Sequence, residues 1–178
     1  MQLLFGSSEN SAEIMKNQKI WLKTIVEVQM NGRLDYKKGV YWQKKQTSFD
    51  QIIFDGGHNE DALEALYDFI NKKKIKSFVL ILGMAADKVN DNIKSPLEKL
   101  CQLAEKVILT PILSPRTATS KHLSEFLETS VSLKKEMQII QVEGAEQALN
   151  QALSQSLSPL VIAGSFYLVG EMLQILET

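Results

Sequence analysis

The sequence predicts an α/β fold, a doubly wound and mostly parallel sheet flanked by helices. Two observations support this fold class. From Gln51 onward, short apolar runs alternate with amphipathic stretches in five successive strand–helix units. The runs are nearly continuous in Val, Ile, Leu and Phe, which is typical of strands that helices cover on both faces. Because such units follow one another directly, right-handed crossovers and a Rossmann-like sheet are expected.

The predicted strands are the apolar runs and one edge strand. A turn followed by a short hairpin or edge strand is predicted for NGRLDYKKGVYW, residues 31–42. This strand makes the sheet mixed and brings it to about six strands. In chain order the apolar runs are QIIFD (51–55), SFVLILG (77–83), KVILTP (106–111), MQIIQV (137–142) and PLVIAGS (159–165).

The predicted helices are the stretches that follow these runs, where apolar residues recur at helical spacing. SPLE, residues 95–98, predicts a capping box with Pro96 at the first helical position. The lysines at 72–74 predict a helix C-terminus, where positive charge opposes the helix dipole. The apolar stripes are Leu63, Leu66, Tyr67 and Ile70; Leu97, Leu100, Cys101 and Ala104; Leu123, Phe126 and Leu127; Ala145, Ala148, Leu149 and Ala152; and Met172, Ile175 and Leu176.

Composition indicates an ordinary globular domain. The 178 residues suffice for one domain with a core, and residues 1–30 are expected to be a linker or docking segment before a domain at 31–178. A net charge of −1 gives no reason to expect a nucleic-acid or membrane partner. The single cysteine, Cys101, predicts a buried thiol in a reducing cytoplasm. No apolar run approaches the roughly 18 residues of a membrane helix.

Polar residues follow the predicted strands, at the ends where doubly wound sheets usually bind ligands. After the first run, Asp55 could bond a ribose hydroxyl or orient His58, and Gly56 and Gly57 let a ligand approach the backbone closely. Asn59 is expected to cap the next helix. The alternative is that Asp55 and Asn59 only close the turn through local hydrogen bonds. The turn is not G-x-G-x-x-G, so a dinucleotide site is not predicted.

The other candidate segments are 83–88, 114–117 and 164–170. Backbone N–H groups and the hydroxyl of Ser165 at a helix start predict an anion site, with a tight structural turn as the alternative. Arg33 and Arg116 are the only arginines among 20 basic residues. In a chain that otherwise uses lysine, two explanations of these arginines stay open. One is a need for the forked guanidinium, which binds phosphates and carboxylates in two-point contacts; the other is chance or a surface ion pair.

Two kinds of site are excluded by the residues present. One cysteine and two separated histidines, His58 and His122, cannot form a zinc site, and His122 is expected to be solvated at a helix start. No G-x-x-x-x-G-K-[ST] loop occurs, so the chain does not cradle ATP phosphates in that way.

Three separated motifs resemble one known family. They are NGRLDY (31–36), FDGGHN (54–59) and GSFYLVGE (164–171). They are similar to P-G-R-x-E, D-G-A-H-N-P and G-S-x-Y-L-V-G-E in the C-terminal domain of folylpolyglutamate synthase/dihydrofolate synthase, a branch of the Mur ligase superfamily. GMAADKVND (83–91) and SPRTA (114–118) resemble that family's G-x-x-x-D-K-D and P-R-A segments. The resemblance covers about residues 20–178.

The resemblance implies an ATP-dependent ligase that adds L-glutamate to folate or dihydropteroate. In that family, ATP and Mg²⁺ convert the acceptor's carboxylate to an acyl phosphate, and the glutamate amine displaces phosphate to form an amide. The family's N-terminal ATPase domain holds the phosphate loop and the metal. This chain has no such loop, so the resemblance predicts a C-terminal domain that is inactive without an ATPase domain in cis or in trans.

The resemblance also assigns roles to residues at matching positions. Arg33 is expected near the phosphates of ATP and Asp55 at its ribose. His58 and Ser165 are expected to act as the catalytic pair, holding the incoming glutamate or the closed interface.

Lys88 and Arg116 are also expected to bind an anionic group of the substrate, and no metal ligand is expected. Three positions depart from the motifs: Gly57 replaces alanine, a small change in the same turn, and Asn31 and Glu60 replace prolines. Two alternatives stay open, a stand-alone nucleotide- or anion-binding module and a non-catalytic interaction domain.

Overall fold

The structure is a computed structural model that describes residues 32–131, 137–153 and 158–178. The segment expected at residues 1–30 lies outside the described residues, as does Asn31. Within them, six strands form one mixed and mostly parallel sheet in the order β1-β2-β6-β3-β4-β5, which confirms the predicted fold class. The strands are β1 (Asp35–Trp42), β2 (Thr47–Asp55), β3 (Phe78–Leu82), β4 (Ala104–Leu109), β5 (Gln138–Gln141) and β6 (Leu160–Ala163).

The last strand, β6, lies in the middle of the sheet. Val161 of β6 is paired with Ile53 of β2 on one side and with Leu80 of β3 on the other. Every residue of β3 and β6 is buried, as parallel strands with helices on both faces require. β1 pairs antiparallel with β2 and forms the predicted edge strand.

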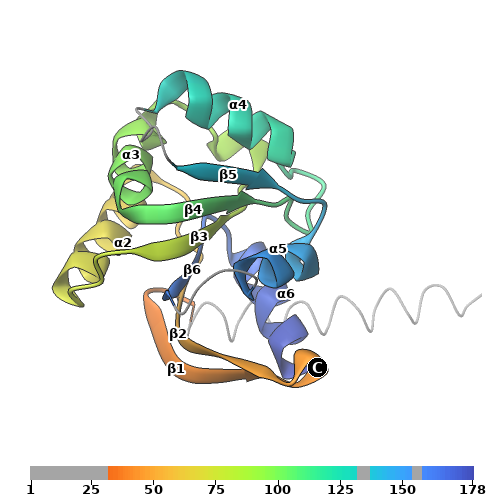
Figure 1. Cartoon of the computed structure of the whole chain (residues 1–178). Helices are drawn as coiled ribbons and strands as arrows, with labels where there is room; N and C mark the ends of the chain where they lie inside the picture. The colour runs from red at the N-terminus through yellow and green to blue at the C-terminus, as the bar shows by residue number, and fades with distance from the viewer. Residues whose placement is uncertain (1–31, 132–136, 154–157) are drawn as a thin grey trace, which may run out of the picture.

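Helices cover both faces of the sheet (Figure 1). Three of them pack on one face and two on the other, and short 3₁₀ turns connect the elements. The first group is α2 (Glu60–Lys72), α3 (Lys94–Leu103) and α4 (Ser120–Ser130); the second is α5 (Ala145–Leu153) and α6 (Phe166–Glu177); the 3₁₀ turns are η1 (Gln43–Lys45), η2 (Ala86–Lys88) and η3 (Asp91–Ile93).

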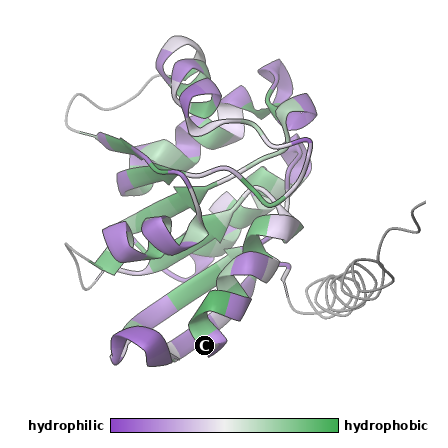
Figure 2. Ribbon diagram, turned by 90° about the vertical axis from the view of Figure 1, so that its right-hand side faces the viewer, coloured by the Kyte–Doolittle hydropathy of each residue, from purple (hydrophilic) through white to green (hydrophobic). Residues whose placement is uncertain are grey.

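The core consists of two apolar layers, one on each side of the sheet. In β3, Leu80 and Leu82 point into the layer under α2, α3 and α4, whereas Val79 and Ile81 point into the layer under α5 and α6. Figure 2 shows the apolar colouring concentrated in the strands and in the helix faces that cover them. The sheet is therefore stabilised by packing on both faces, and the loops at the carboxyl ends of its strands begin from well-defined positions.

Two predicted elements differ from the structure. β5 lies at the sheet edge, so its residues are exposed or half-buried and not covered on both faces. α3 does not begin at the SPLE capping box: it begins at Lys94, because η3 leads directly into it, and no side chain caps it at Ile93. α3 ends at Leu103, so Ala104 opens β4 and does not extend the helical stripe.

Other local predictions are confirmed. α2 ends at Lys72, within the lysine cluster. Cys101 is buried in α3, and His122 is exposed in the first turn of α4. None of the helices in the described ranges is both long enough and apolar enough to span a bilayer.

Lys106 is a buried lysine in an otherwise apolar part of the sheet. It lies in β4 beside Val79, whose side chain belongs to the layer under α5 and α6. The residue is 4% exposed, and its Nζ has no hydrogen-bond partner among the described residues. Loss of water lowers the pKa of this ammonium group, and the negative charge of Glu105 opposes the shift.

We expect Lys106→Met to raise the free energy of unfolding by about 1–3 kcal/mol at pH 7, because it removes an unsatisfied buried charge. The folded-state pKa is lowered, so wild-type stability rises with pH until the unfolded chain also loses its proton near 10.5. The gain from Lys106→Met should therefore shrink between pH 7 and pH 10 in urea unfolding. The exposed Lys76→Met is the matched control; an equal gain there would contradict the explanation.

Candidate functional site

The carboxyl ends of β2, β6, β3 and β4 meet at one edge of the sheet, and the predicted site residues follow them. β6 lies between β2 and β3, but α6 packs on the face opposite to α2 and α3. The connections therefore diverge at this edge, and ligands of open α/β sheets bind in the crevice that such divergence creates.

Asp55 ends β2 and joins three segments of the chain at this edge. Its Oδ1 accepts a hydrogen bond from the Gly57 N–H (2.6 Å), and its Oδ2 accepts one from the Leu34 N–H (3.3 Å). Its backbone carbonyl accepts from the N–H of Gly164, which follows β6 (3.2 Å). The Asp55 carboxylate therefore holds the segment that carries Arg33 against the β2–α2 turn.

Burial raises the pKa of the Asp55 carboxyl, whereas the N–H groups of Gly57 and Leu34 and the positive charge of Arg33 oppose the shift. Asp55 is 2% exposed, so its ionised form depends on these few groups. Buried carboxyls in a crevice, with a nearby charge partner, are common at functional sites.

The β2–α2 turn also contains local hydrogen bonds, as expected if Asp55 and Asn59 serve only to close the turn. Asn59 caps α2, where its Oδ1 accepts from the Ala62 N–H (3.0 Å). Nδ1 of His58 lies 3.3 Å from the carbonyl oxygen of Gly56. In the described part of the chain no hydrogen bond joins His58 to Asp55, so the suggestion that Asp55 orients His58 has no support in the geometry.

Backbone hydrogen bonds tie the β3–α3 loop to the β4–α4 loop. The Ala86 N–H donates to the Arg116 carbonyl (2.7 Å), and the Ala118 N–H donates to the Met84 carbonyl (2.9 Å). Lys88 and Arg116 therefore extend from two loops that are fixed to each other.

Glu171 of α6 carries a half-buried carboxylate. The backbone N–H of Leu113 favours its ionised form. Burial raises the pKa of Glu171, and its Oε2 has no hydrogen-bond partner among the described residues.

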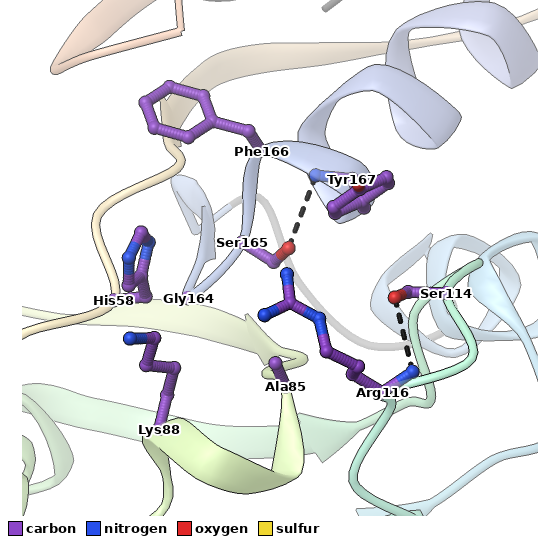
Figure 3. Close-up of a pocket in the computed structure, with 9 residues that line it drawn as sticks. All are labelled: His58, Ala85, Lys88, Ser114, Arg116, Gly164, Ser165, Phe166 and Tyr167. Atoms are coloured by element: carbon purple, nitrogen blue, oxygen red, sulfur yellow. Dashed lines mark hydrogen bonds between the residues drawn. The ribbon is translucent and has the colours of Figure 1, made fainter. Parts of the chain in front are cut away.

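A cavity of about 90 Å³, called the Ser165 pocket below, lies between these loops and the start of α6 (Figure 3). Ser165 caps α6, where its Oγ accepts from the Tyr167 N–H (3.1 Å), so its hydroxyl proton can still be donated to a ligand. In Figure 3 the Arg116 guanidinium reaches toward Ser165, and the Lys88 ammonium lies on the side of His58. The lining residues are His58, Ala85, Lys88, Ser114, Arg116, Gly164, Ser165, Phe166 and Tyr167.

The Ser165 pocket suits a small anionic group. Its volume is well below the roughly 300 Å³ at which pockets for whole ligands begin. Lys88 and Arg116 supply positive charge, and Ser165 supplies a donor at the N-terminus of α6, where the helix dipole favours anions. One carboxylate or one phosphate group matches this size and charge.

Two further cavities lie nearby. The Asp55 pocket, about 220 Å³, is lined by Arg33, Leu34, Asp55, Asn59, Asp61, Ala62 and Ala65. The Asn90 pocket, about 290 Å³, is lined by His58, Asn59, Glu60, Asp61, Asp87, Lys88, Asn90, Asn92 and Ile93. It shares His58 and Lys88 with the Ser165 pocket.

The six predicted site residues therefore fall into two groups. Arg33 and Asp55 line the Asp55 pocket. The other four line the Ser165 pocket: His58, Lys88, Arg116 and Ser165.

Sequence reasoning did not single out Phe166 and Tyr167, although they lie within a candidate segment. The Phe166 ring packs against Gly56 so closely that a Cβ at Gly56 would overlap it. Glycine at this position therefore serves the contact between the β2–α2 turn and α6. The sequence signal that could have identified them is the position of two aromatic residues directly after Ser165, the capping serine at a strand-to-helix turn.

Metal binding has no support in the described ranges. No group of three or more His, Cys, Asp or Glu there could hold a metal ion.

The sequence matches the family described as "Dihydrofolate synthetase, C-terminal domain" over residues 34–175. Comparison with curated proteins gives no match. Escherichia coli FolC in complex with DHPP and ADP is 25% identical over 71% of this chain and 28% of its own, with a TM-score of 0.57. A bifunctional folylpolyglutamate synthase/dihydrofolate synthase from Yersinia pestis, complexed with AMPPNP and Mn ion, is 26% identical over 83% of this chain and 32% of its own, with a TM-score of 0.59.

A Mycobacterium tuberculosis folylpolyglutamate synthase complexed with ADP and AMPPCP shares the fold, with a TM-score of 0.62 and 18% identity. The aligned region covers 83% of this chain and 32% of that one. The chain thus spans about a third of the length of these solved structures.

Gly57 is tightly enclosed, so alanine at this position is not a small change. A Cβ there would lie 2.5 Å from Ala62 Cβ and 2.7 Å from Asp55 Oδ1. We expect Gly57→Ala to destabilise the fold by about 1–3 kcal/mol, because the helix start or the carboxylate must shift. The added substitution Ala62→Gly should recover part of this loss, because it removes the closest contact.

Gly144→Ala is the matched control, because nothing lies within 4 Å of its added Cβ. It should change stability by less than about 0.5 kcal/mol. Thermal unfolding of the variants measures both effects. If Gly57→Ala were as stable as Gly144→Ala, the close contact with Ala62 would be refuted.

Proposed function

Because the chain belongs to the dihydrofolate synthetase C-terminal domain family, we propose that it is the C-terminal domain of an ATP-dependent ligase that joins L-glutamate to folate or dihydropteroate. The observation that carries the proposal is the arrangement of two adjoining sites at the carboxyl edge of the sheet. One combines a buried carboxylate with an arginine, and the other is a small cationic pocket.

The Asp55 pocket is the proposed nucleotide contact. The Asp55 carboxylate can accept hydrogen bonds from ribose hydroxyls, and the Arg33 guanidinium can contact phosphate oxygens in two-point fashion. Both side chains line the same cavity, and the Asp55 carboxylate also holds the segment next to Arg33 through the Leu34 N–H. A complex of a relative with AMPPNP and Mn ion agrees with nucleotide and metal use in the family.

The Ser165 pocket is the proposed contact for the incoming amino acid. Lys88 and Arg116 would pair with a carboxylate of L-glutamate, and the Ser165 hydroxyl would donate to it. His58, at the junction with the Asn90 pocket, would hold the amino acid or the closed interface. A structure of a relative has been determined with Mn, AMPPNP and L-glutamate bound.

The remaining parts of the reaction are assigned to an N-terminal ATPase domain, in cis or in trans. When bound, ATP supplies the phosphoryl group that activates the acceptor's carboxylate as an acyl phosphate, which the glutamate amine attacks. Mg²⁺ and the phosphates would be held mainly by that other domain, and the chain alone would be inactive. A stand-alone nucleotide- or anion-binding module, or a non-catalytic interaction domain, is the competing function.

Binding of ADP tests the nucleotide contact directly. We expect Arg33→Ala and Asp55→Asn each to weaken ADP binding by about tenfold or more in calorimetric titration, because each removes a charge-assisted contact. Lys72→Ala, which removes an exposed cation from the far end of α2, should leave the affinity within about twofold. ADP binding that tolerates both site substitutions would reject the assignment of the Asp55 pocket.

Reconstitution tests the ligase itself. Combined with the N-terminal ATPase domain of a family member, the chain should support ATP-dependent amide formation with L-glutamate. His58→Ala or Ser165→Ala should lower that activity by about tenfold or more, by loss of a positioning hydrogen bond. Nucleotide binding without reconstituted activity would favour the binding module, and the absence of both would favour the interaction domain. Activity that survives both substitutions would reject these two residues as the catalytic pair.

A further inference from the structure

Asp87 lies next to the Ser165 pocket, and its carboxylate is close to both cationic side chains of that pocket, Lys88 and Arg116. Its Oδ2 is 3.6 Å from Lys88 Nζ and 4.0 Å from Arg116 Nη1. Asp87 does not line the Ser165 pocket itself; it lines the adjoining Asn90 pocket. The carboxylate therefore lies beside the two cations but does not line the Ser165 pocket.

The backbone keeps Asp87 in this position. Asp87 is the middle residue of η2, whose first residue, Ala86, is hydrogen-bonded to the Arg116 carbonyl. The Lys88 N–H closes the turn on the Ala85 carbonyl (3.0 Å). Asp87, Lys88 and Arg116 thus belong to one rigid pair of loops.

The charge of Asp87 affects ligands more than it affects stability. The side chains of Asp87 and Arg116 are 50% and 66% exposed, and ion pairs this exposed contribute little to folding. A fixed negative charge close to a pocket nevertheless acts on any charged ligand there, in proportion to the ligand's charge. Beside two positive side chains, Asp87 leaves the pocket with about one net positive charge.

We infer that Asp87 weakens the preference of the Ser165 pocket for a doubly charged anion, such as a phosphate group, relative to a singly charged carboxylate. This inference rests on the proposed function, in which the pocket takes a carboxylate of the incoming amino acid. The proposed reaction handles phosphates in the same cleft, and a pocket with the full charge of Lys88 and Arg116 would bind them in competition with the amino acid. A dianion feels the repulsion from Asp87 about twice as strongly as a monoanion does.

The test compares acetate and sulfate, which carry one and two negative charges at pH 7. Binding is followed at constant ionic strength by the amide NMR shifts of Ser165 and Tyr167 in the 178-residue chain. In Asp87→Asn, sulfate affinity should rise by about tenfold and acetate affinity by about threefold, so the preference shifts toward sulfate by about threefold. A purely structural role for Asp87 would weaken both ions and could not produce this gain.

The matched control is Asp91→Asn, the same substitution in the same loop. Asp91 pairs with Lys94 (2.9 Å) and not with Lys88 or Arg116, so its loss should leave the preference unchanged. If acetate binds but Asp87→Asn leaves the preference unchanged, or Asp91→Asn shifts it equally, the inference fails while the anion pocket stands. If neither ion perturbs these amides in any variant, both the inference and the proposed use of this pocket are overturned.

Discussion

The parallel pairing of β6 with both β2 and β3 is the constraint on which the site depends. Along the chain, β3, β4 and β5 and the helices between them separate β2 from β6. In the sheet, however, β6 lies between β2 and β3, so the three strands end side by side. Their pairing places Asp55, the β3–α3 loop and Ser165 along one edge, and the hydrogen bond from Gly164 N–H to the Asp55 carbonyl closes it. The apolar layers on both faces make this pairing costly to rearrange, so the loops start from fixed points.

Charged groups at the carboxyl edge of the sheet lie in positions that are unfavourable for the stability of the fold. Asp55 is buried at the end of an apolar strand, where ionisation is unfavourable. Among the described residues, two N–H groups and the charge of Arg33 offset that cost. Lys88 and Arg116 extend from loops that are tied by backbone hydrogen bonds, and both side chains line one pocket. In the proposed function, such features lower stability and prepare binding, which is the usual trade-off at functional sites.

Local features were predictable wherever one segment contains all the relevant information. Continuous apolar runs predicted the central strands, and Asn59 and Ser165 were correctly placed at helix starts. The errors arose where a neighbouring element decides the outcome. β5 has an apolar sequence but lies at the edge, and η3 replaces the SPLE cap by running into α3. At Gly57, a motif comparison could not anticipate the contact with Ala62, because that contact depends on how α2 packs on the turn.

By itself, the sequence determined the α/β class, the identity of most elements and the segments that carry the site, because periodicity and capping are properties of short stretches. It also determined which residue types are present, and thus excluded a zinc set and a phosphate loop of the G-x-x-x-x-G-K-[ST] type within these 178 residues. Only the tertiary structure decided the strand order, the separation of Arg33 and Asp55 from the Ser165 pocket, and the place of Asp87 beside two cations. The physical reason is that apolar runs of similar composition do not encode their partners; long-range packing selects the pairing, and the pairing sets which loops meet.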